Sequence, residues 1–254
     1  MSSQEPNAPK LDRSQIAAYY DAYWHFKGRP VIPTPPPEVI RIMRREIAAG
    51  SACLDVGCGN GRAGGLPLRA MGCRYIGVDV SRAAIDAARK IGLDARQIND
   101  AADLPFSDAS FDAVIAMEVL EHLVLPKPAV LEMMRVLKPG GVLLATSPNV
   151  AYWRRRLELV VGRWNPLGHP DAAARPWADP HLRFFTVGTL RQLLREAGFH
   201  EIQVGGHGGH LLGDIPRIGK LLRKAEGSRA YRLLEHWRPS TFGCFLNAVA
   251  RKPR

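Results

Sequence analysis

Two carboxylates and one imidazole stand close together in the segment EVLEH, residues 118–122. If this segment is helical, its spacing places Glu118, Glu121 and His122 on one face. Such a set could bind a divalent cation. Alternatively, the imidazole could accept a proton from a reacting hydroxyl, because its ordinary pKa is about 6.5. The same residue types also cap helices or line pockets, so these interpretations stay open.

A glycine-rich loop follows a short apolar run in CLDVGCGNGR, residues 53–62. Gly57, Gly59 and Gly61 spell G-x-G-x-G, a pattern that lets a ligand approach the backbone closely. A dinucleotide-binding loop needs its third glycine one position later, where Arg62 stands. Asp55 would also repel a pyrophosphate, whereas it would attract a cationic amino acid group. The loop therefore favours a ligand with an ammonium group over a nicotinamide dinucleotide.

Four further segments follow the loop in order: YIGVDVS (75–81), DAADLPF (100–106), SFDAVIAM (110–117) and LKPGGVL (137–143). With the loop, they resemble the class I S-adenosylmethionine-dependent methyltransferases over residues 50–205. The resemblance implies that Asp79 binds both ribose hydroxyls of the cofactor, since a carboxylate accepts two hydrogen bonds. It also implies that Asp100 contacts the exocyclic amine of adenine. The expected cofactor contacts are Tyr20, Asp55, Gly57, Cys58, Gly59, Gly61, Asp79, Val80, Asp100, Ala101 and Met117.

The EVLEH segment resembles that of metal-binding methyltransferases that act on ubiquinone precursors or on the terminal ribose of small RNAs. In the latter, a later histidine completes the ligand set, and His181 stands at a comparable place in DPHLRFFT, residues 179–186. The resemblance thus implies a site for Mg²⁺, Mn²⁺ or Zn²⁺ made by Glu118, Glu121, His122 and His181. Without a metal, His122 or His181 is the candidate catalytic base.

Short runs rich in Val, Ile and Leu at residues 52–56, 75–78, 113–117 and 142–146 alternate with helical patterns. This alternation predicts a parallel sheet covered by helices on both faces. Helices are expected at 83–91, capped by Ser81, and at 127–137, ended by KPGG. Further helices at 151–161 and 189–197, and strands at 202–204 and 245–250, are expected later in the chain. The family resemblance implies a Rossmann-like α/β fold with seven strands, the last of them antiparallel.

The first 49 residues are expected to form a helical cap with a Pro-rich linker, ahead of a methyltransferase domain at 50–254. An aromatic helix is expected at 14–26, an extended linker at 30–37 and a second helix at 38–49. The aromatic helix resembles the one that covers the cofactor in this family, where Tyr19, Tyr20 or Tyr23 would touch the methionine carboxylate. Packing of these rings into a core is the alternative.

Positive charge is concentrated in the later part of the chain. Residues 151–254 carry 18 Lys and Arg against 8 Asp and Glu, whereas residues 1–150 carry 17 against 16. Basic insertions at about 150–182 and 207–240, with an amphipathic stretch at 215–237, suggest an anionic acceptor, a membrane surface or nucleic acid. The alternatives are a lid helix packed on the domain and a solvated basic face. The polar start and the lack of a long apolar run predict a cytoplasmic protein, with peripheral membrane contact as an open possibility.

Four cysteines without a CxxC pair predict buried free thiols, and GGHGGH, residues 205–210, predicts a glycine-rich surface turn for His207 and His210. The chain, 46% hydrophobic and 23% charged, cannot be wholly disordered or collagen-like. The predicted function is O-methylation of a small, carrier-linked or lipid-linked metabolite. Metal-dependent 2'-O-methylation of an RNA terminus is a second hypothesis, although no RNA-binding module is recognisable. A non-catalytic regulator that binds S-adenosylmethionine is the third.

Overall fold

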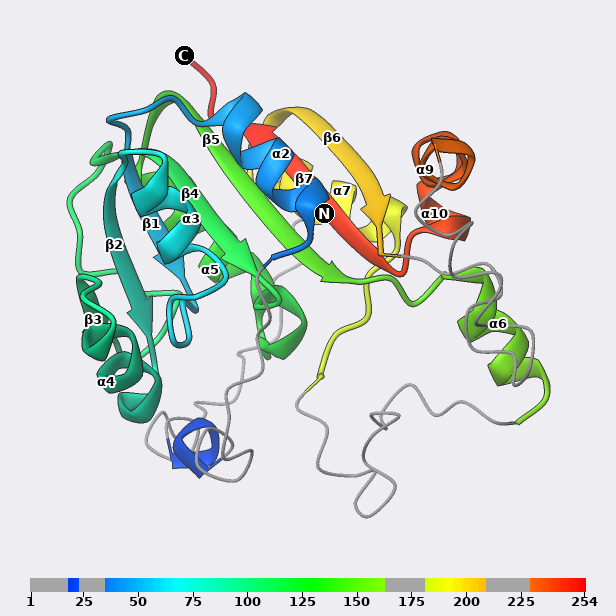
Figure 1. The fold of residues 1–254 in the computed structure, drawn as a ribbon, viewed down its shortest axis with the longest axis horizontal. Coiled ribbons are helices and arrows are strands. Elements are labelled where there is room, and N and C mark those ends of the chain that lie inside the picture. Colours follow the sequence, from blue (N-terminus) through cyan, green and yellow to red (C-terminus); the bar gives the residue numbers. More distant parts are fainter. Residues whose placement is uncertain (1–17, 23–34, 163–180, 209–228) are drawn as a thin grey trace, which may run out of the picture.

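The structure, a computed structural model, describes residues 18–22, 35–162, 181–208 and 229–254. Seven strands form one sheet in the order β3-β2-β1-β4-β5-β7-β6 (Figure 1). β1 to β5 are parallel, and β7 is antiparallel to both of its neighbours. The predicted fold is confirmed. The strands are β1 (Ala52–Val56), β2 (Arg74–Asp79), β3 (Ala95–Gln97), β4 (Phe111–Met117), β5 (Leu137–Pro148), β6 (His200–His207) and β7 (Phe245–Arg251).

Helices connect these strands, and residues 18–22 are also helical. Ser81 caps α4 as predicted, because its hydroxyl accepts a hydrogen bond from the Ala84 backbone N–H at 3.2 Å, a contact worth about 1 kcal/mol. Among the described residues, no helix is both long and apolar enough to cross a bilayer. The helices are α2 (Pro37–Glu46), α3 (Gly65–Ala70), α4 (Arg82–Lys90), the 3₁₀ helix η1 (Leu120–His122), α5 (Pro126–Val136), α6 (Trp153–Val160), α7 (Val187–Glu196), α9 (Arg229–Trp237) and α10 (Pro239–Phe242).

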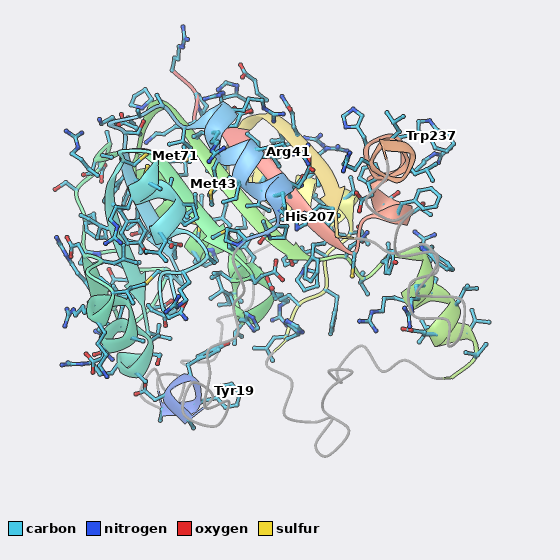
Figure 2. All side chains as sticks on the ribbon, viewed as in Figure 1. Tyr19, Arg41, Met43, Met71, His207 and Trp237 are labelled. Atoms are coloured by element: carbon cyan, nitrogen blue, oxygen red, sulfur yellow. The ribbon has the colours of Figure 1, made fainter. Side chains whose placement is uncertain are left out.

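Side chains of the central strands alternate between two cores, one on each face of the sheet. On β4, Ala113 and Ile115 face the core that contains Met43 of α2, whereas Val114 and Ala116 face the core under α5 and α7. Accordingly, α2 and α3 lie on one face and α5 and α7 on the other (Figure 1). Met43 is fully buried between α2 and the sheet (Figure 2). Both faces are covered, as a buried parallel sheet requires.

Several elements differ from the sequence-based expectation. β5 begins at Leu137, because the KPGG segment continues the strand through a register shift opposite Phe111 and Ala113. β6 covers eight residues, since it pairs with β7 along most of its length. The short elements β3 and α10 were not predicted. Tyr23 and most of the two basic insertions, residues 163–180 and 209–228, lie outside the described residues.

The carboxyl ends of the parallel strands bring the expected site residues to one edge of the sheet. The chain order reverses between the neighbouring strands β1 and β4, and ligands of open α/β sheets bind at such a reversal. The loops after β1, β2 and β4 leave from this edge, and the helical segment 18–22 lies beyond it (Figure 1). Cys53, Cys58 and Cys73 are buried free thiols as predicted, and Cys244 is half-buried.

Candidate functional site

The glycine loop after β1 has a backbone conformation that favours glycine. Gly57, Gly59 and Gly61 have φ angles of 69°, 53° and 73°, which lie in the left-handed region. A Cβ on Gly57 would lie 2.5 Å from a methyl carbon of Val119, and one on Gly61 would lie 2.2 Å from a methyl carbon of Leu93. The glycines therefore allow close packing as well as the turn, and Gly57 brings the loop against the EVLEH segment.

Asp79 ends β2, and its carboxylate is held from two sides. Its two oxygens accept backbone hydrogen bonds from Gly59 and Ser81, each at 2.9 Å. Burial raises the pKa of Asp79, while these hydrogen bonds oppose the shift. Each oxygen keeps a lone pair for a further donor, so the geometry suits the predicted contact with a vicinal diol. Val80 follows directly and is half-buried.

Asp55 lies beneath the glycine loop and is 1% exposed. The hydroxyl of Tyr75 donates a hydrogen bond to its Oδ2 at 3.0 Å. Burial raises the pKa of Asp55 to about 8, although the Tyr75 hydrogen bond opposes this shift, so the carboxyl is mostly neutral at pH 7. Its attraction for a cationic group stays a prediction. Tyr75 was not singled out from the sequence, because its contact with Asp55 depends on the register between β1 and β2.

Asp100 and Ala101 lie in a turn shortly after β3. Asp100 accepts a hydrogen bond from the backbone N–H of Ala102 at 2.9 Å. The backbone N–H of Ile98 donates to the carbonyl of Asp79 at 2.9 Å, which connects this turn to the end of β2. The Asp79 and Asp100 segments are thus neighbours, as the resemblance implies, and Met117 ends β4 on the same edge. Their contacts with a cofactor stay predictions.

The helical segment 18–22 joins two of the loops at this edge. Asp21 accepts hydrogen bonds from the Ser81 hydroxyl at 2.6 Å and from the Ala83 backbone N–H at 3.2 Å, at the start of α4. The ring of Tyr20 meets the imidazole of His122 edge-on, with the centroids 6.1 Å apart. This segment therefore lies where a covering helix is expected. Asp21 carries part of its docking, although the sequence analysis did not single it out.

The EVLEH segment does not form an α-helix, which was the condition for placing its three side chains on one helical face. Glu118 has a φ of 55°, and only residues 120–122 form one turn of 3₁₀ helix. The Thr146 hydroxyl donates a hydrogen bond to Oε1 of Glu118 at 2.8 Å, and the Glu118 N–H donates to the Thr146 carbonyl at 3.2 Å. One shared helical face therefore does not form, because a left-handed residue at the strand end interrupts helical geometry.

Glu121, His122 and His181 nevertheless converge. One ligand atom from each lies within 4.8 Å of the others. The two imidazoles stack with centroids 4.8 Å apart, and Nε2 of His122 is 3.9 Å from Oε1 of Glu121. Leu182 and Arg183 donate backbone hydrogen bonds to the Glu121 carbonyl at 2.8 and 2.9 Å. These bonds anchor the segment that carries His181.

The carboxyls of Glu118 and Glu121 are buried, and their neighbours offset only part of the cost of a negative charge there. Glu121 is 1% exposed, and neither of its carboxylate oxygens has a hydrogen-bond partner within the described part of the chain. Burial, and then the charge of Glu118, raise the pKa of Glu121. Burial also raises the pKa of Glu118 to about 7, against the opposing effects of Thr146 and His181. A proton or a cation must compensate such a pair, and carboxylate with imidazole donors fit the divalent metal that the resemblance implies.

His207 is not part of a surface turn, contrary to what its glycine neighbours suggest. It lies in β6, 4% exposed, with Nδ1 3.3 Å from the amide nitrogen of Asn247 and its ring stacked on Phe245. Burial lowers the pKa of His207 to about 4, so the imidazole is neutral at pH 7. It is a core residue of the β6–β7 pair. His210 lies outside the described residues.

Comparison with known proteins agrees with this geometry. Residues 54–145, from β1 into β5, match the family described as "Methyltransferase domain". A solved structure from Thermotoga maritima, described as an S-adenosylmethionine-dependent methyltransferase and possible histamine N-methyltransferase, has the same fold. Its TM-score is 0.61 at 19% identity, over 93% of this chain and 99% of that one.

Three relatives extend the match in sequence. A probable S-adenosylmethionine-dependent methyltransferase of Mycolicibacterium smegmatis is 35% identical over 186 residues, which cover 72% of this chain but only 65% of that protein. A demethylmenaquinone methyltransferase of Clavibacter sepedonicus is 32% identical over 61% of this chain and 68% of its own length. A ubiquinone biosynthesis O-methyltransferase of Xanthomonas oryzae is 30% identical over 58% and 66%. The chain therefore belongs to the class I S-adenosylmethionine-dependent methyltransferases.

Proposed function

We propose that this protein transfers the methyl group of S-adenosylmethionine to a hydroxyl oxygen of a small, carrier-linked or lipid-linked metabolite. The observation that carries the proposal is the buried carboxyl of Glu121 beside the stacked imidazoles of His122 and His181. An oxygen nucleophile needs a group that removes or acidifies its proton, and this cluster lies next to the glycine loop. The likeness to an O-methyltransferase of ubiquinone biosynthesis supports the same type of reaction.

Residues at the carboxyl edge of the sheet account for binding and alignment. The glycine loop leaves its backbone open to close approach, Asp79 accepts hydrogen bonds from the ribose hydroxyls, and Asp100 accepts one from the adenine amine. S-adenosylmethionine supplies an electrophilic methyl group on a sulfonium that leaves as a neutral thioether. Tyr20 and its helical segment cover the edge and exclude water. Alignment and exclusion of water are the main demands of an in-line displacement.

The acceptor hydroxyl must lose its proton as the new carbon–oxygen bond forms. A divalent ion held by Glu121, His122 and His181 would lower the pKa of that hydroxyl. In a metal-free site, a neutral imidazole of His122 or His181 takes the proton directly. The ligand atoms that converge come from Glu121, His122 and His181. Glu118, held by the hydroxyl of Thr146, is a second buried carboxyl whose charge acts on Glu121. The chain thus offers two routes for the proton, and they differ in their response to a chelator.

The acceptor class is tested with S-adenosylmethionine labelled in its methyl group. The purified protein is incubated with the labelled cofactor and with three fractions of an extract of its own cells: polar small molecules, lipids and RNA. A labelled methyl ether in the first or second fraction, identified by mass spectrometry, supports the proposal. Label at the terminal ribose of RNA would favour RNA methylation instead. Cofactor binding without label in any fraction would favour the non-catalytic regulator.

Metal binding is tested first by thermal stability, which does not depend on turnover, and then by turnover. Mn²⁺ or Mg²⁺ should raise the thermal unfolding midpoint of the wild-type protein, because a ligand that binds only the folded state stabilises it. Glu121→Gln should abolish that rise, whereas Glu196→Gln, at an exposed side chain of α7, should retain it. Turnover should stop in EDTA and return with added metal. Full turnover in EDTA would exclude the metal route, and normal turnover in both His122→Ala and His181→Ala would exclude both routes.

A further inference from the structure

α9 exposes an apolar stripe beside a cationic side chain. Leu233 and Trp237, one helical turn apart, are 67% and 68% exposed. Trp237 points away from the body of the molecule (Figure 2), and the guanidinium of Arg238 lies 4.9 Å from the centroid of its ring. Glu235 of the same helix is buried. Arg232 and His236 are exposed as well. α9 therefore presents two large apolar side chains to the solvent beside polar ones, whereas a surface helix ordinarily turns its apolar side inward.

α6 also exposes large apolar side chains. None of its residues is buried. Leu157 and Val160, three positions apart on one side of the helix, are 55% and 82% exposed. The ion pairs lie elsewhere on the helix: Glu158 contacts Arg154 at 2.9 Å and Arg155 at 3.0 Å, and all three are half-buried. Leu159 is 54% exposed too. The aliphatic side chains of α6 are therefore its more exposed ones, and the ion-paired side chains are its less exposed ones.

Both helices lie at the same end of the long axis of the molecule, beyond the β6–β7 edge of the sheet (Figure 1). We call Leu157, Val160, Leu233 and Trp237 the exposed apolar set. Arg156 on α6 and Arg238 after α9 are exposed next to it in the chain. Residues 151–254, which include both helices, carry 18 Lys and Arg against 8 Asp and Glu. Aliphatic and Trp side chains bordered by arginines are typical of segments that lie in the interface of a bilayer.

We propose that this end of the protein docks on an anionic lipid surface. The exposed apolar set enters the headgroup region, and Arg156 and Arg238 contact lipid phosphates. Exposed apolar side chains alone would equally suit a protein partner, but the bordering guanidiniums and the positive charge of this part of the chain favour an anionic bilayer. The proposal is independent of the acceptor of the methyl group, because it depends on α6 and α9 alone.

The test is co-sedimentation of the full chain with vesicles of phosphatidylcholine alone or of equal parts of phosphatidylcholine and phosphatidylserine. We expect binding to the second kind only, weakened by salt. The double variant Leu233→Glu/Trp237→Glu should lower binding by about tenfold or more. Its control is Leu131→Glu, at a side chain 45% exposed on α5. Arg156→Glu/Arg238→Glu should also lower binding by about tenfold or more, whereas Arg44→Glu, at an exposed side chain of α2, should not.

Every other outcome overturns the proposal. Equal binding to both kinds of vesicle, no binding to either, or unchanged binding by the two double variants would each do so. Light scattering without vesicles identifies one competing occupant. A dimer that Leu233→Glu/Trp237→Glu converts to monomer, in a protein that binds no vesicles, would assign this face to a second copy of the chain. All the substituted side chains are exposed, so an unchanged unfolding midpoint is the check that each variant is folded.

Discussion

At the scale of single residues, the carboxylate of Asp79 holds together the parts of the predicted cofactor site. It accepts hydrogen bonds from Gly59 of the glycine loop and from Ser81 at the start of α4. Ser81 in turn donates to Asp21 of the helical segment 18–22. One side chain therefore positions the loop, the helix start and, indirectly, the covering segment.

Asp79→Asn should weaken cofactor binding while leaving the protein folded. The amide loses the charge and replaces one acceptor oxygen with a donor. Hydrogen bonds to charged groups contribute about 1.5 to 3 kcal/mol, so the Kd for S-adenosylmethionine, measured by calorimetry, should rise by about tenfold or more. Asp86→Asn, on the exposed side of α4, is the control. An unchanged Kd would remove Asp79 from the cofactor site.

Ionisation of Asp55 should make the cofactor-free protein less stable as the pH rises. Its pKa is about 8 in the folded chain, against an ordinary value of 3.8, so between these values the folded state holds the extra proton. The stability from this group is complete below pH 3.8 and is lost as the pH rises toward 8, by up to about 1.4 kcal/mol per pH unit.

Asp55→Asn keeps an acceptor for the Tyr75 hydroxyl and cannot ionise. The free energy of unfolding, measured with urea from pH 5 to pH 9, should therefore fall less steeply in this variant than in the wild type. Glu118 and Glu121 titrate in both proteins, so their contributions cancel in the comparison. Identical slopes would show that Asp55 is already ionised in the folded wild type.

At the scale of elements, the sequence predicts those features that depend on residues close together in the chain. β1 is found at its predicted residues, 52–56, because an apolar run ends abruptly at a glycine loop, and the Ser81 cap is equally local. The φ of Glu118 is not local, since it is coupled to Thr146 on β5. The burial of His207 depends on the pairing of β6 with β7. The cluster of Glu121, His122 and His181 was therefore predicted in its members but not in its geometry.

Gly57→Ala and Gly50→Ala separate two costs of adding a methyl group. Both glycines have left-handed φ angles, 69° and 78°, but a Cβ meets nothing within 4 Å at Gly50 and lies 2.5 Å from Val119 at Gly57. Backbone strain alone should make Gly50→Ala cost about 1 kcal/mol of unfolding free energy. Gly57→Ala should cost about 2 to 4 kcal/mol, since overpacking adds to the strain. Val119→Ala should recover part of that difference, and equal costs at the two sites would contradict the packing argument.

At the scale of the whole molecule, Asn149 joins segments far apart in the chain. It is 3% exposed, and its amide donates to the carbonyls of Gly243, Pro239 and Ser240 at 2.7, 3.2 and 3.3 Å. Its side-chain oxygen accepts from the backbone N–H of Ala151 at 3.0 Å. Asn149 thereby fixes α10 and the start of β7 against the end of β5.

Asn149→Ala should lower the free energy of unfolding by about 2 to 3 kcal/mol, because buried carbonyls lose their donor. Denaturant unfolding should show a lower midpoint with an unchanged slope, since the surface exposed on unfolding stays the same. Gln97→Ala, which removes one hydrogen bond from an exposed side chain to the Val80 carbonyl, should change the midpoint little. A loss no larger than that of the control would mean that α10 is held by other contacts.

The position of β7 also matters while the protein is being made. β7 lies between β5 and β6 in the sheet, yet residues 245–251 follow every other strand in the chain. Until these residues leave the ribosome, β5 has an unpaired edge and β6 has no partner strand. Exposed edges invite pairing with other chains, and synthesis adds only about 5 to 20 residues per second. A nascent chain therefore has an open sheet until residues 245–251 can pair, and during that interval its edges are available to other chains.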